Sequence, residues 1–419
     1  MPISPAMPAQ RLERAADLAA PAAPLTSGTG WFARLWAGGF SRVLDRIDAG
    51  LDSGAIHATL PDGSNRVLGG RAPGFVAIVH LKDWRALLRL ATGGSIGWYQ
   101  AWEAGEWDSP DPVPLFALFM ANAVALGPTA RAAGPWKLAA RAFHWLHRNS
   151  RAGARRNIHA HYDLGNDFYA AWLDPAMVYS SARFGAEHQS LGEAQQAKLA
   201  SIASRVAGAR EVLEIGCGWG ALAAHLRDRG AAVTAISLSD EQLAWARSRH
   251  GGSIDFRKQD YRDVSGQFDA IVSVEMVEAV GRKYWPDFFD CLARCLKPGG
   301  RAALQYISIA EPIFPAYSAS ADFIQAYVFP GGMLVSEAEF RRLAAERGLE
   351  WTDQESFGLD YARTLRTWRE NFDAAVTQGR LPAGFDQRFV RLWRYYLMYC
   401  EGGFLSGGIN VSQVTLIRR

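Results

Sequence analysis

Residues 212–226, VLEIGCGWGALAAHL, place three glycines between an apolar strand-like segment and an amphipathic helix-like segment. These glycines are Gly216, Gly218 and Gly220. A backbone without Cβ atoms lets a ligand approach closely, and nucleotide-type cofactors bind at such strand–loop–helix junctions. The stretch therefore predicts an α/β domain that binds a cofactor at this glycine loop.

Two features beside the loop indicate which cofactor it holds. Glu214 comes at the end of the strand, where its carboxylate can meet a cationic group such as the methionyl ammonium of S-adenosylmethionine. The next expected strand ends in Ala235-Ile236-Ser237 and offers no acidic residue for a ribose diol, which a nicotinamide-binding fold normally supplies. Asp240 follows three residues later and reads as a helix N-terminal residue. Adenosylmethionine is therefore favoured over a nicotinamide dinucleotide.

Around the loop, strand-like and helix-like segments alternate, which is the pattern of a parallel sheet with helical crossovers. We expect helices at Ser239–His250 and Tyr284–Leu296, and a turn at Lys297–Gly300 before the last strand. The expected strands are Glu211–Ile215, Val233–Ser237, Ile254–Gln259, Ala270–Val274 and Ala302–Ile307. The predicted fold class is α/β, a Rossmann-like class I methyltransferase sheet with a smaller N-terminal α+β domain.

The 419 residues are too many for one ordinary core and divide into four segments. Residues 1–30 are rich in Pro, Ala and Gly and read as a flexible tail, and 31–130 as an N-terminal accessory domain. Residues 131–158 read as a basic linker helix, because seven Lys or Arg and no acidic residue occur from Arg131 to Arg156. This helix either packs on its neighbour or attracts anionic phospholipid headgroups. Residues 159–419 form the expected methyltransferase domain.

Composition limits the cellular location of the protein and the classes of partner that it binds. A net charge of +3 does not argue for nucleic acid, and the four cysteines show neither CxxC pairing nor the spacing of a secreted disulfide framework. No stretch reaches the roughly 18 apolar residues of a membrane-spanning helix. We expect a cytoplasmic protein that is peripheral to the inner face of the membrane, and the sequence leaves a homodimer open.

From about His159 to the C-terminus, the chain resembles the cyclopropane fatty acid synthases and related mycolic acid methyltransferases. The residues from Trp31 to Ala125 resemble the N-terminal extension of the longer bacterial members more loosely. The resemblance rests on ordered motifs, which are HYDLGNDFYAAWLDPAMVYSSARF, VLEIGCGWGALA, ISLSDEQ, QDYRD, VEMVEAVGRKYWPDFF, LKPGG, FPGGMLVS, DYARTLRTWRENF and YYLMYCEGGFLSGGINVSQVTL.

The resemblance assigns further residues to the adenosylmethionine site. It implies that Tyr179 and Ser180 line the cofactor together with Gly216, Gly218 and Gly220. It also implies that Ser237, Leu238 and Gln242 meet the adenosine and that Tyr261 lies near the adenine ring. Taken alone, Tyr179 and Tyr261 would pass for core aromatic residues and Gln242 for a solvated helix residue.

The resemblance also implies a bicarbonate ion that removes a proton from a carbocation. The residues around that ion correspond to Ser181, Glu278, Gln305, Ile307 and Tyr361. This chain departs from the family at three positions, because it has Ser181 where Cys is common, Gln305 where His is common, and Ala279 in place of the His that usually follows the Glu. Hydroxyl and amide groups can still donate hydrogen bonds to an oxyanion.

The resulting expectation is a C-methyltransferase that acts on the double bonds of unsaturated phospholipid acyl chains and gives cyclopropane fatty acids through a carbocation. Three alternatives stay open. The same transfer can give a methyl-branched fatty acid, because the position of the base decides which proton leaves. The chain can also be a catalytically inactive lipid-binding relative, or a methyltransferase for small molecules.

Overall fold

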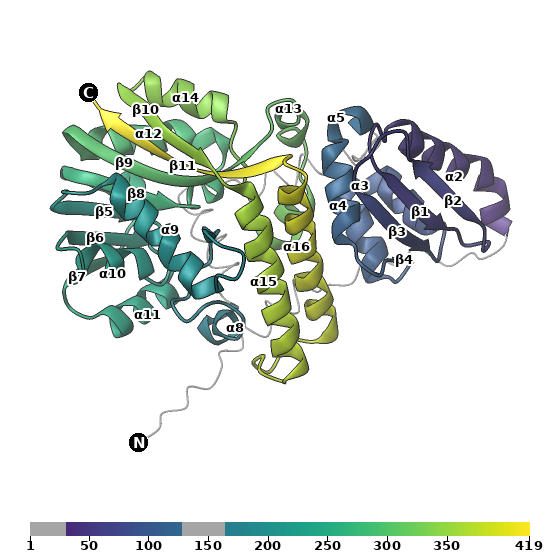
Figure 1. Ribbon diagram of the computed structural model, residues 1–419, viewed down its shortest axis with the longest axis horizontal. Helices are drawn as coiled ribbons and strands as arrows, with labels where there is room; N and C mark the ends of the chain where they lie inside the picture. The colour runs from purple at the N-terminus through teal and green to yellow at the C-terminus, as the bar shows by residue number, and fades with distance from the viewer. Residues whose placement is uncertain (1–30, 128–163) are drawn as a thin grey trace.

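The computed structural model describes residues 31–127 and 164–419. The expected tail at 1–30 and the expected linker helix at 131–158 both lie outside the described residues. Within the described part, the chain forms two sheets, one of four strands and one of seven, joined by a pair of long helices (Figure 1).

The N-terminal part is an α+β unit with strand order β2-β1-β3-β4. β1 pairs antiparallel with β2 and parallel with β3, and β3 pairs antiparallel with β4. Its elements are α2 (Trp31–Ala49), β1 (Ala55–Thr59), β2 (Asn65–Gly69), β3 (Val76–Leu81), α3 (Arg85–Glu103), β4 (Trp107–Asp108), α4 (Val113–Ala121) and α5 (Ala123–Leu126).

The small sheet buries one face and exposes the other. Leu68, Ala77 and Val79 point into the core, whereas Val67 and Ile78 are 57% and 48% exposed. This alternation follows from the two-residue period of a strand.

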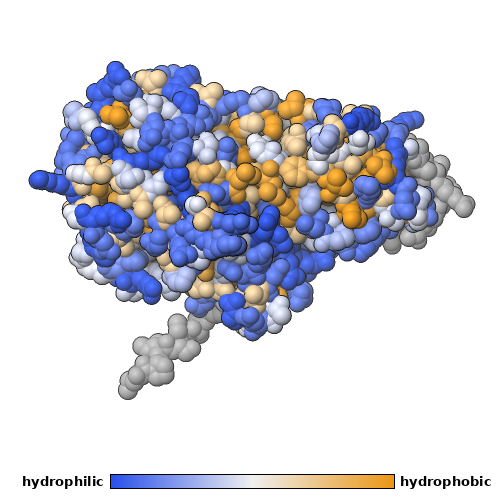
Figure 2. Space-filling view, in the orientation of Figure 1, coloured by the Kyte–Doolittle hydropathy of each residue, from blue (hydrophilic) through white to orange (hydrophobic). Residues whose placement is uncertain are grey.

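In the face of the molecule that Figure 2 shows, apolar side chains gather over the N-terminal part and its junction with the larger sheet. The far end of the larger sheet is mostly hydrophilic in the same view.

The seven-stranded sheet has the order β10-β11-β9-β8-β5-β6-β7. β5 to β9 run parallel, and β11 is antiparallel to both β9 and β10. The strands are β5 (Glu211–Ile215), β6 (Ala232–Ser237), β7 (Ile254–Lys258), β8 (Phe268–Val274), β9 (Leu296–Ile309), β10 (Leu349–Ser356) and β11 (Ile409–Arg418). The strand order reverses beside β5, and ligands of open α/β sheets bind at such a reversal.

Helices cover this sheet and connect its strands. Two of these helices begin at well-formed caps, since Ser190 and Glu193 form a reciprocal capping box at α9, and the Ser239 hydroxyl accepts a hydrogen bond from the Gln242 amide at α11. The helical elements are α8 (Asn166–Ala170), α9 (Leu191–Arg205), α10 (Ala221–Arg227), α11 (Asp240–His250), η2 (Tyr261–Asp263), η3 (Val277–Ala279), η4 (Arg282–Tyr284), α12 (Trp285–Cys295), α13 (Phe314–Tyr317), η5 (Ile324–Val328), α14 (Glu337–Ala345), α15 (Gly358–Thr377) and α16 (Gln387–Leu405).

The five expected strands are confirmed, with one difference in the last. β9 begins at Leu296 and not at Ala302, so the expected turn at Lys297–Gly300 lies inside the strand. Leu296 still pairs with Phe268, and the register shifts before Arg301 pairs with Ala270. Gly299 has φ +75°, a conformation that glycine adopts easily and that permits the shift of register at this point of the strand. The antiparallel strands β10 and β11 were not expected from the sequence.

One hydrophobic core runs through both parts of the molecule and includes residues as far apart as Leu44, Phe116 and Tyr306. α16 contacts α4 closely, because a Cβ atom on Gly402 would lie 2.6 Å from the Phe116 Cβ. Arg388 of α16 also forms an ion pair with Glu103 of α3. No helix among the described residues is long and apolar enough to cross a membrane.

Candidate active site

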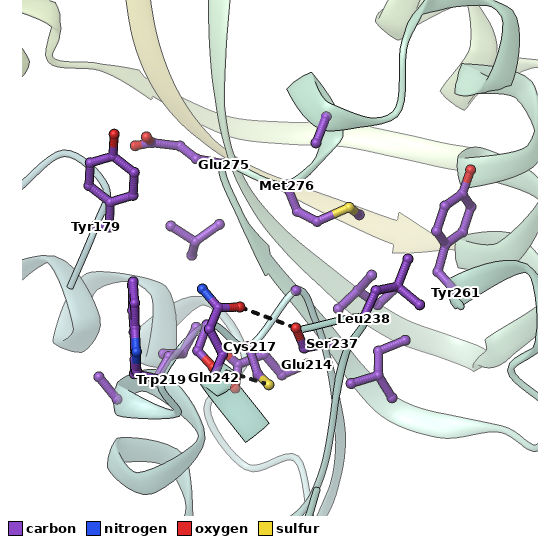
Figure 3. A pocket seen from close by; sticks show the side chains of 18 of the residues that line it. Tyr179, Glu214, Cys217, Trp219, Ser237, Leu238, Gln242, Tyr261, Glu275 and Met276 are labelled. Atoms are coloured by element: carbon purple, nitrogen blue, oxygen red, sulfur yellow. Dashed lines mark hydrogen bonds between the residues drawn. The ribbon is translucent and has the colours of Figure 1, made fainter. Parts of the chain in front are cut away.

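Two neighbouring cavities lie at the carboxyl ends of the parallel strands. The first has a volume of ≈ 180 Å³ and is lined by the glycine loop and the ends of β6 and β8 (Figure 3). The second has a volume of ≈ 350 Å³, is mostly apolar, and is lined by α3, α4, α15 and α16 among other elements. Tyr179, Glu275 and Ala279 line both cavities. We call the first the cofactor cavity and the second the apolar cavity.

The glycine loop is held in a conformation that other residues rarely adopt. Gly216, Gly218 and Gly220 have φ values of 84°, 52° and 86°. Added Cβ atoms at Gly216 and Gly220 would lie 2.5 Å from the Met276 Cγ and 3.0 Å from the Phe256 ring, whereas one at Gly218 would meet no described atom within 4 Å. Two of the glycines are therefore needed for packing, and Gly218 turns its bare backbone toward the cofactor cavity.

Ser237, Leu238, Gln242 and Tyr261, which the sequence predicts to meet the cofactor, all line the cofactor cavity. The Ser237 hydroxyl donates to the Gln242 side-chain oxygen at 3.2 Å. The Tyr261 hydroxyl is buried and has no hydrogen-bond partner among the described residues. Figure 3 shows Tyr261 on one side of the cavity and Tyr179 with Glu275 on the other. The cavity therefore has polar groups on two opposite sides and suits a ligand with both polar and apolar parts.

Glu214 lies in β5 beneath the loop and is 4% exposed. Its Oε2 has no hydrogen-bond partner among the described residues. Burial raises the pKa of this carboxyl to about 8, although the charge of Lys198 opposes the shift. A buried carboxyl with one unpartnered oxygen, the open backbone at Gly218 and the Tyr261 hydroxyl fit adenosylmethionine, whose ammonium and adenine need such partners.

Ser180 lies behind the cofactor cavity and is not part of its wall. Its hydroxyl accepts a hydrogen bond from the Lys198 ammonium at 2.6 Å. Lys198 lines the cofactor cavity and is 1% exposed, and burial lowers its pKa to about 8 against the charges of Glu275, Asp174 and Glu214. Sequence reasoning missed this lysine, because on a helix such as α9 a lone lysine reads as a solvated residue.

Three of the five expected catalytic residues converge on a fourth side chain, Glu275. Its Oε1 accepts the Ser181 backbone amide at 2.9 Å and the Gln305 side-chain amide at 2.7 Å. Its Oε2 accepts the Tyr361 hydroxyl at 2.7 Å. Glu275 has φ +48°, an uncommon backbone conformation for a residue other than glycine. Burial raises the pKa of this carboxyl, and the three donors oppose the shift by stabilising its ionised form.

Glu278 follows on η3 and makes different contacts. Its Oε1 accepts the backbone amide of Ile307, the remaining expected residue, and its Oε2 has no partner among the described residues. Burial, followed by the charge of Glu275, raises its pKa to about 8. Burial and the charge of Glu275 thus favour the protonated form of Glu278, whereas the three donors to Glu275 favour its ionised form.

This arrangement does not fit a bicarbonate ion held by the expected residues. The Ser181 amide, the Gln305 amide and the Tyr361 hydroxyl already donate to Glu275. The Ser181 hydroxyl points elsewhere and donates to the Ala182 carbonyl oxygen at 3.0 Å. A carboxylate of the chain itself takes up the donors that the resemblance assigns to bicarbonate.

Sequence reasoning missed Glu275, although a signal for it was present. It follows β8 directly, and β8 lies next to β5, whose end carries the glycine loop. Polar residues at the carboxyl ends of adjacent parallel strands face a common ligand site. In the stretch VEMVEA, the resemblance assigns a role to Glu278 and none to Glu275, three residues earlier.

Comparisons with known proteins identify the family of this chain. The family profile described as mycolic acid cyclopropane synthetase matches residues 149–414. The tuberculostearic acid methyltransferase UfaA1 of Mycobacterium tuberculosis is 38% identical over 83% of this chain and 84% of its own length. The cyclopropane-fatty-acyl-phospholipid synthase of Escherichia coli K12 is 38% identical over 62% of this chain and 66% of its own length.

Among solved structures, the mycolic acid cyclopropane synthase CmaA1, in complex with SAH and CTAB, superposes with a TM-score of 0.58 at 27% identity. The match covers 63% of this chain and 98% of the other. The cyclopropane synthase MmaA2 of Mycobacterium tuberculosis gives a TM-score of 0.57 at the same identity and coverage. This chain therefore belongs to the mycolic acid cyclopropane synthetase family and is an S-adenosylmethionine-dependent C-methyltransferase.

Proposed function

We propose that this enzyme transfers a methyl group to a double bond in the acyl chain of an unsaturated phospholipid, and that the product is a branched chain with an exocyclic methylene group and not a cyclopropane. The observation that carries the proposal is the position of Glu275, which lines both cavities and holds three hydrogen-bond donors. Relatives whose names refer to fatty acids or phospholipids support the substrate class. Since phospholipids reside in bilayers, we place the reaction at the membrane surface.

The two cavities suit the two reactants. The cofactor cavity would hold adenosylmethionine, which supplies an electrophilic methyl group. The apolar cavity would hold the acyl chain and exclude water, so that the double bond meets the methyl group where Tyr179 and Glu275 line both spaces. An alkene needs no deprotonation before it attacks, so the enzyme contributes mainly position and a dry surrounding.

Proton removal completes the reaction. The alkene electron pair forms the new bond to the methyl carbon, the sulfur–methyl bond breaks, and the positive charge stays on the acyl chain. Glu275 is the proposed base, because three hydrogen-bond donors stabilise its carboxylate form and it lies where the two cavities meet. It would accept a proton from the new methyl group, whose C–H electron pair quenches the cation.

The hydrogen bonds to Glu275 support the branched product. Three donors stabilise the ionised carboxylate and so weaken it as a base. Slow proton removal gives time for a neighbouring hydride to shift, which moves the cation to the methylated carbon. Loss of a methyl proton from that cation gives an exocyclic methylene group, whereas loss before the shift closes a ring. UfaA1, which spans both parts of the chain, has a name that fits the branched product.

The cyclopropane remains the second candidate, because the E. coli relative of equal identity is named for it. Product analysis separates the two. The enzyme is incubated with trideuteromethyl adenosylmethionine and phosphatidylglycerol vesicles with monounsaturated chains, and the lipid is examined by mass spectrometry and proton NMR. We expect a product that keeps two deuterons on a vinylidene carbon and takes up hydrogen on catalytic reduction.

Other products would contradict the proposal in distinct ways. Two deuterons on a ring carbon that resists reduction would establish the cyclopropane. Three deuterons would show that the acyl chain, and not the new methyl group, lost the proton, which would remove Glu275 from the proposed position. No labelled lipid, with cofactor binding intact, would indicate another acceptor or an inactive lipid-binding relative.

A further inference from the structure

The apolar cavity extends beyond the methyltransferase sheet into the N-terminal part. Its wall includes Gly93, Ser95 and Trp98 of α3 and Phe119 and Met120 of α4. Glu275 and Glu278, which follow β8 of the seven-stranded sheet, line the same cavity. The family profile begins at residue 149, so this section of the wall lies outside the part of the chain that the profile matches.

α3 is kinked where it borders the cavity. Gly94 has φ 58° and ψ −136°, which interrupts the helix. At the preceding position, a Cβ atom on Gly93 would meet no described atom within 4 Å. The two glycines and Ser95 therefore leave space where an unbroken helix with ordinary side chains would fill the cavity.

The kink is fixed relative to the reaction centre. The Ser95 hydroxyl accepts the Phe323 backbone amide at 3.1 Å, immediately before η5. The Gln100 side-chain amide donates to the Tyr327 hydroxyl at 3.3 Å within η5. Arg391 of α16 donates to the Trp102 carbonyl oxygen at 2.6 Å and lies over the Trp102 ring. Because these contacts join α3 to both η5 and α16, the distance from the kink to Glu275 is set by the fold.

We propose that the kink of α3 forms the far wall of the acyl-chain pocket and that Gly93 limits the length of chain that fits beyond the reacting double bond. The N-terminal part is then a determinant of substrate length. This inference rests on the proposed function for the identity of the ligand as an acyl chain. Filling the space at Gly93 shortens the pocket without touching the cofactor cavity.

The test compares Gly93→Phe with Gly93→Ala in the full-length enzyme. The Ala variant keeps a small side chain and a helical backbone, so it controls for loss of glycine. Both receive phosphatidylglycerol vesicles whose chains share one distance from carboxyl to double bond and differ only in length beyond it. We expect Gly93→Phe to lower kcat/KM for the longest chain relative to the shortest by about tenfold or more, the scale on which apolar pockets discriminate by size.

Gly93→Ala is expected to keep the wild-type ratio, and both variants are expected to keep the wild-type affinity for adenosylmethionine. An unchanged length ratio in Gly93→Phe, in a folded protein that binds the cofactor, would overturn the inference. Binding of the free fatty acids of the same series, measured by calorimetry, gives an independent readout. If the wild type transfers no methyl group to lipid, the proposed function fails, yet loss of long-chain binding in Gly93→Phe alone would still support the pocket wall.

Discussion

The cofactor cavity and the apolar cavity are built in different ways. The cofactor cavity takes its wall from loops that follow consecutive parallel strands, so Gly218, Ser237 and Tyr261 each belong to a short local motif. The apolar cavity draws on segments from Ile47 to Ile409. Glu275 lies where the two meet. Cofactor binding is therefore a local property of this chain, whereas the apolar cavity depends on how distant segments pack.

The largest expected effect separates the two carboxyl groups at this junction. Glu275→Gln should lower kcat by about 10²–10⁴-fold, because an amide cannot accept the proton. Glu278→Gln should cost less, since an amide resembles the protonated carboxyl and its oxygen can still accept the Ile307 amide. Single-turnover rates and adenosylmethionine affinity would be measured for both variants, with circular dichroism to establish folding.

Equal losses in the two glutamine variants would mean that the pair acts as one unit. A larger loss in Glu278→Gln would transfer the role of base to Glu278.

A smaller effect tests the cofactor cavity alone. Gly218→Val should weaken adenosylmethionine binding by about a hundredfold, or about 2.7 kcal/mol, because the side chain would occupy ligand space at a φ of 52°. Gly230→Val is the matched control, since Gly230 has φ 91° and no described atom near its Cβ but lies outside both cavities. Calorimetric titration gives the affinities.

If Gly230→Val weakens cofactor binding as much as Gly218→Val, strain and not ligand contact explains the result. Wild-type affinity in a folded Gly218→Val enzyme would move the cofactor elsewhere.

The smallest expected effect is the pH dependence of cofactor binding. Burial raises the pKa of Glu214 to about 8, so this carboxyl is largely protonated below that pH and must ionise to meet a cationic ligand. Lys198, with a pKa of about 8, loses its repelling charge over the same range. Affinity for adenosylmethionine should therefore rise with pH, by at most about tenfold per unit for each titrating group, and level off above about 8.

Glu214→Gln is expected to flatten this rise, and the wild type should release a proton on binding, measurable by calorimetry in buffers of different ionisation heat. The raised pKa also means that Glu214 contributes stability below its ordinary value of 4.5 that is lost as pH rises through about 8. The free protein should unfold at lower denaturant at pH 8 than at pH 6, and less so in Glu214→Gln. A pH-independent affinity would exclude Glu214 as the partner of the ammonium.

Much of the wall of the cofactor cavity could be predicted, and much of the proposed proton-transfer site could not. Ser237, Leu238, Gln242 and Tyr261 lie where the motifs indicated. Ser181, Gln305 and Tyr361 also lie together, but around Glu275, because hydrogen-bond partners from three separate segments are chosen by packing and not by spacing along the chain.

The parallel sheet, the glycine loop and the family follow from the amino-acid sequence alone, because strand periodicity, turn residues and ordered motifs are local signals. The roles of three other features depend on the tertiary structure. It brought Glu275 under three donors, buried Lys198 beside the cofactor cavity, and carried the kink of α3 to the apolar cavity. Each depends on contacts between residues far apart in the chain, and the burial that shifts their pKa values or opens their space exists only once those contacts form.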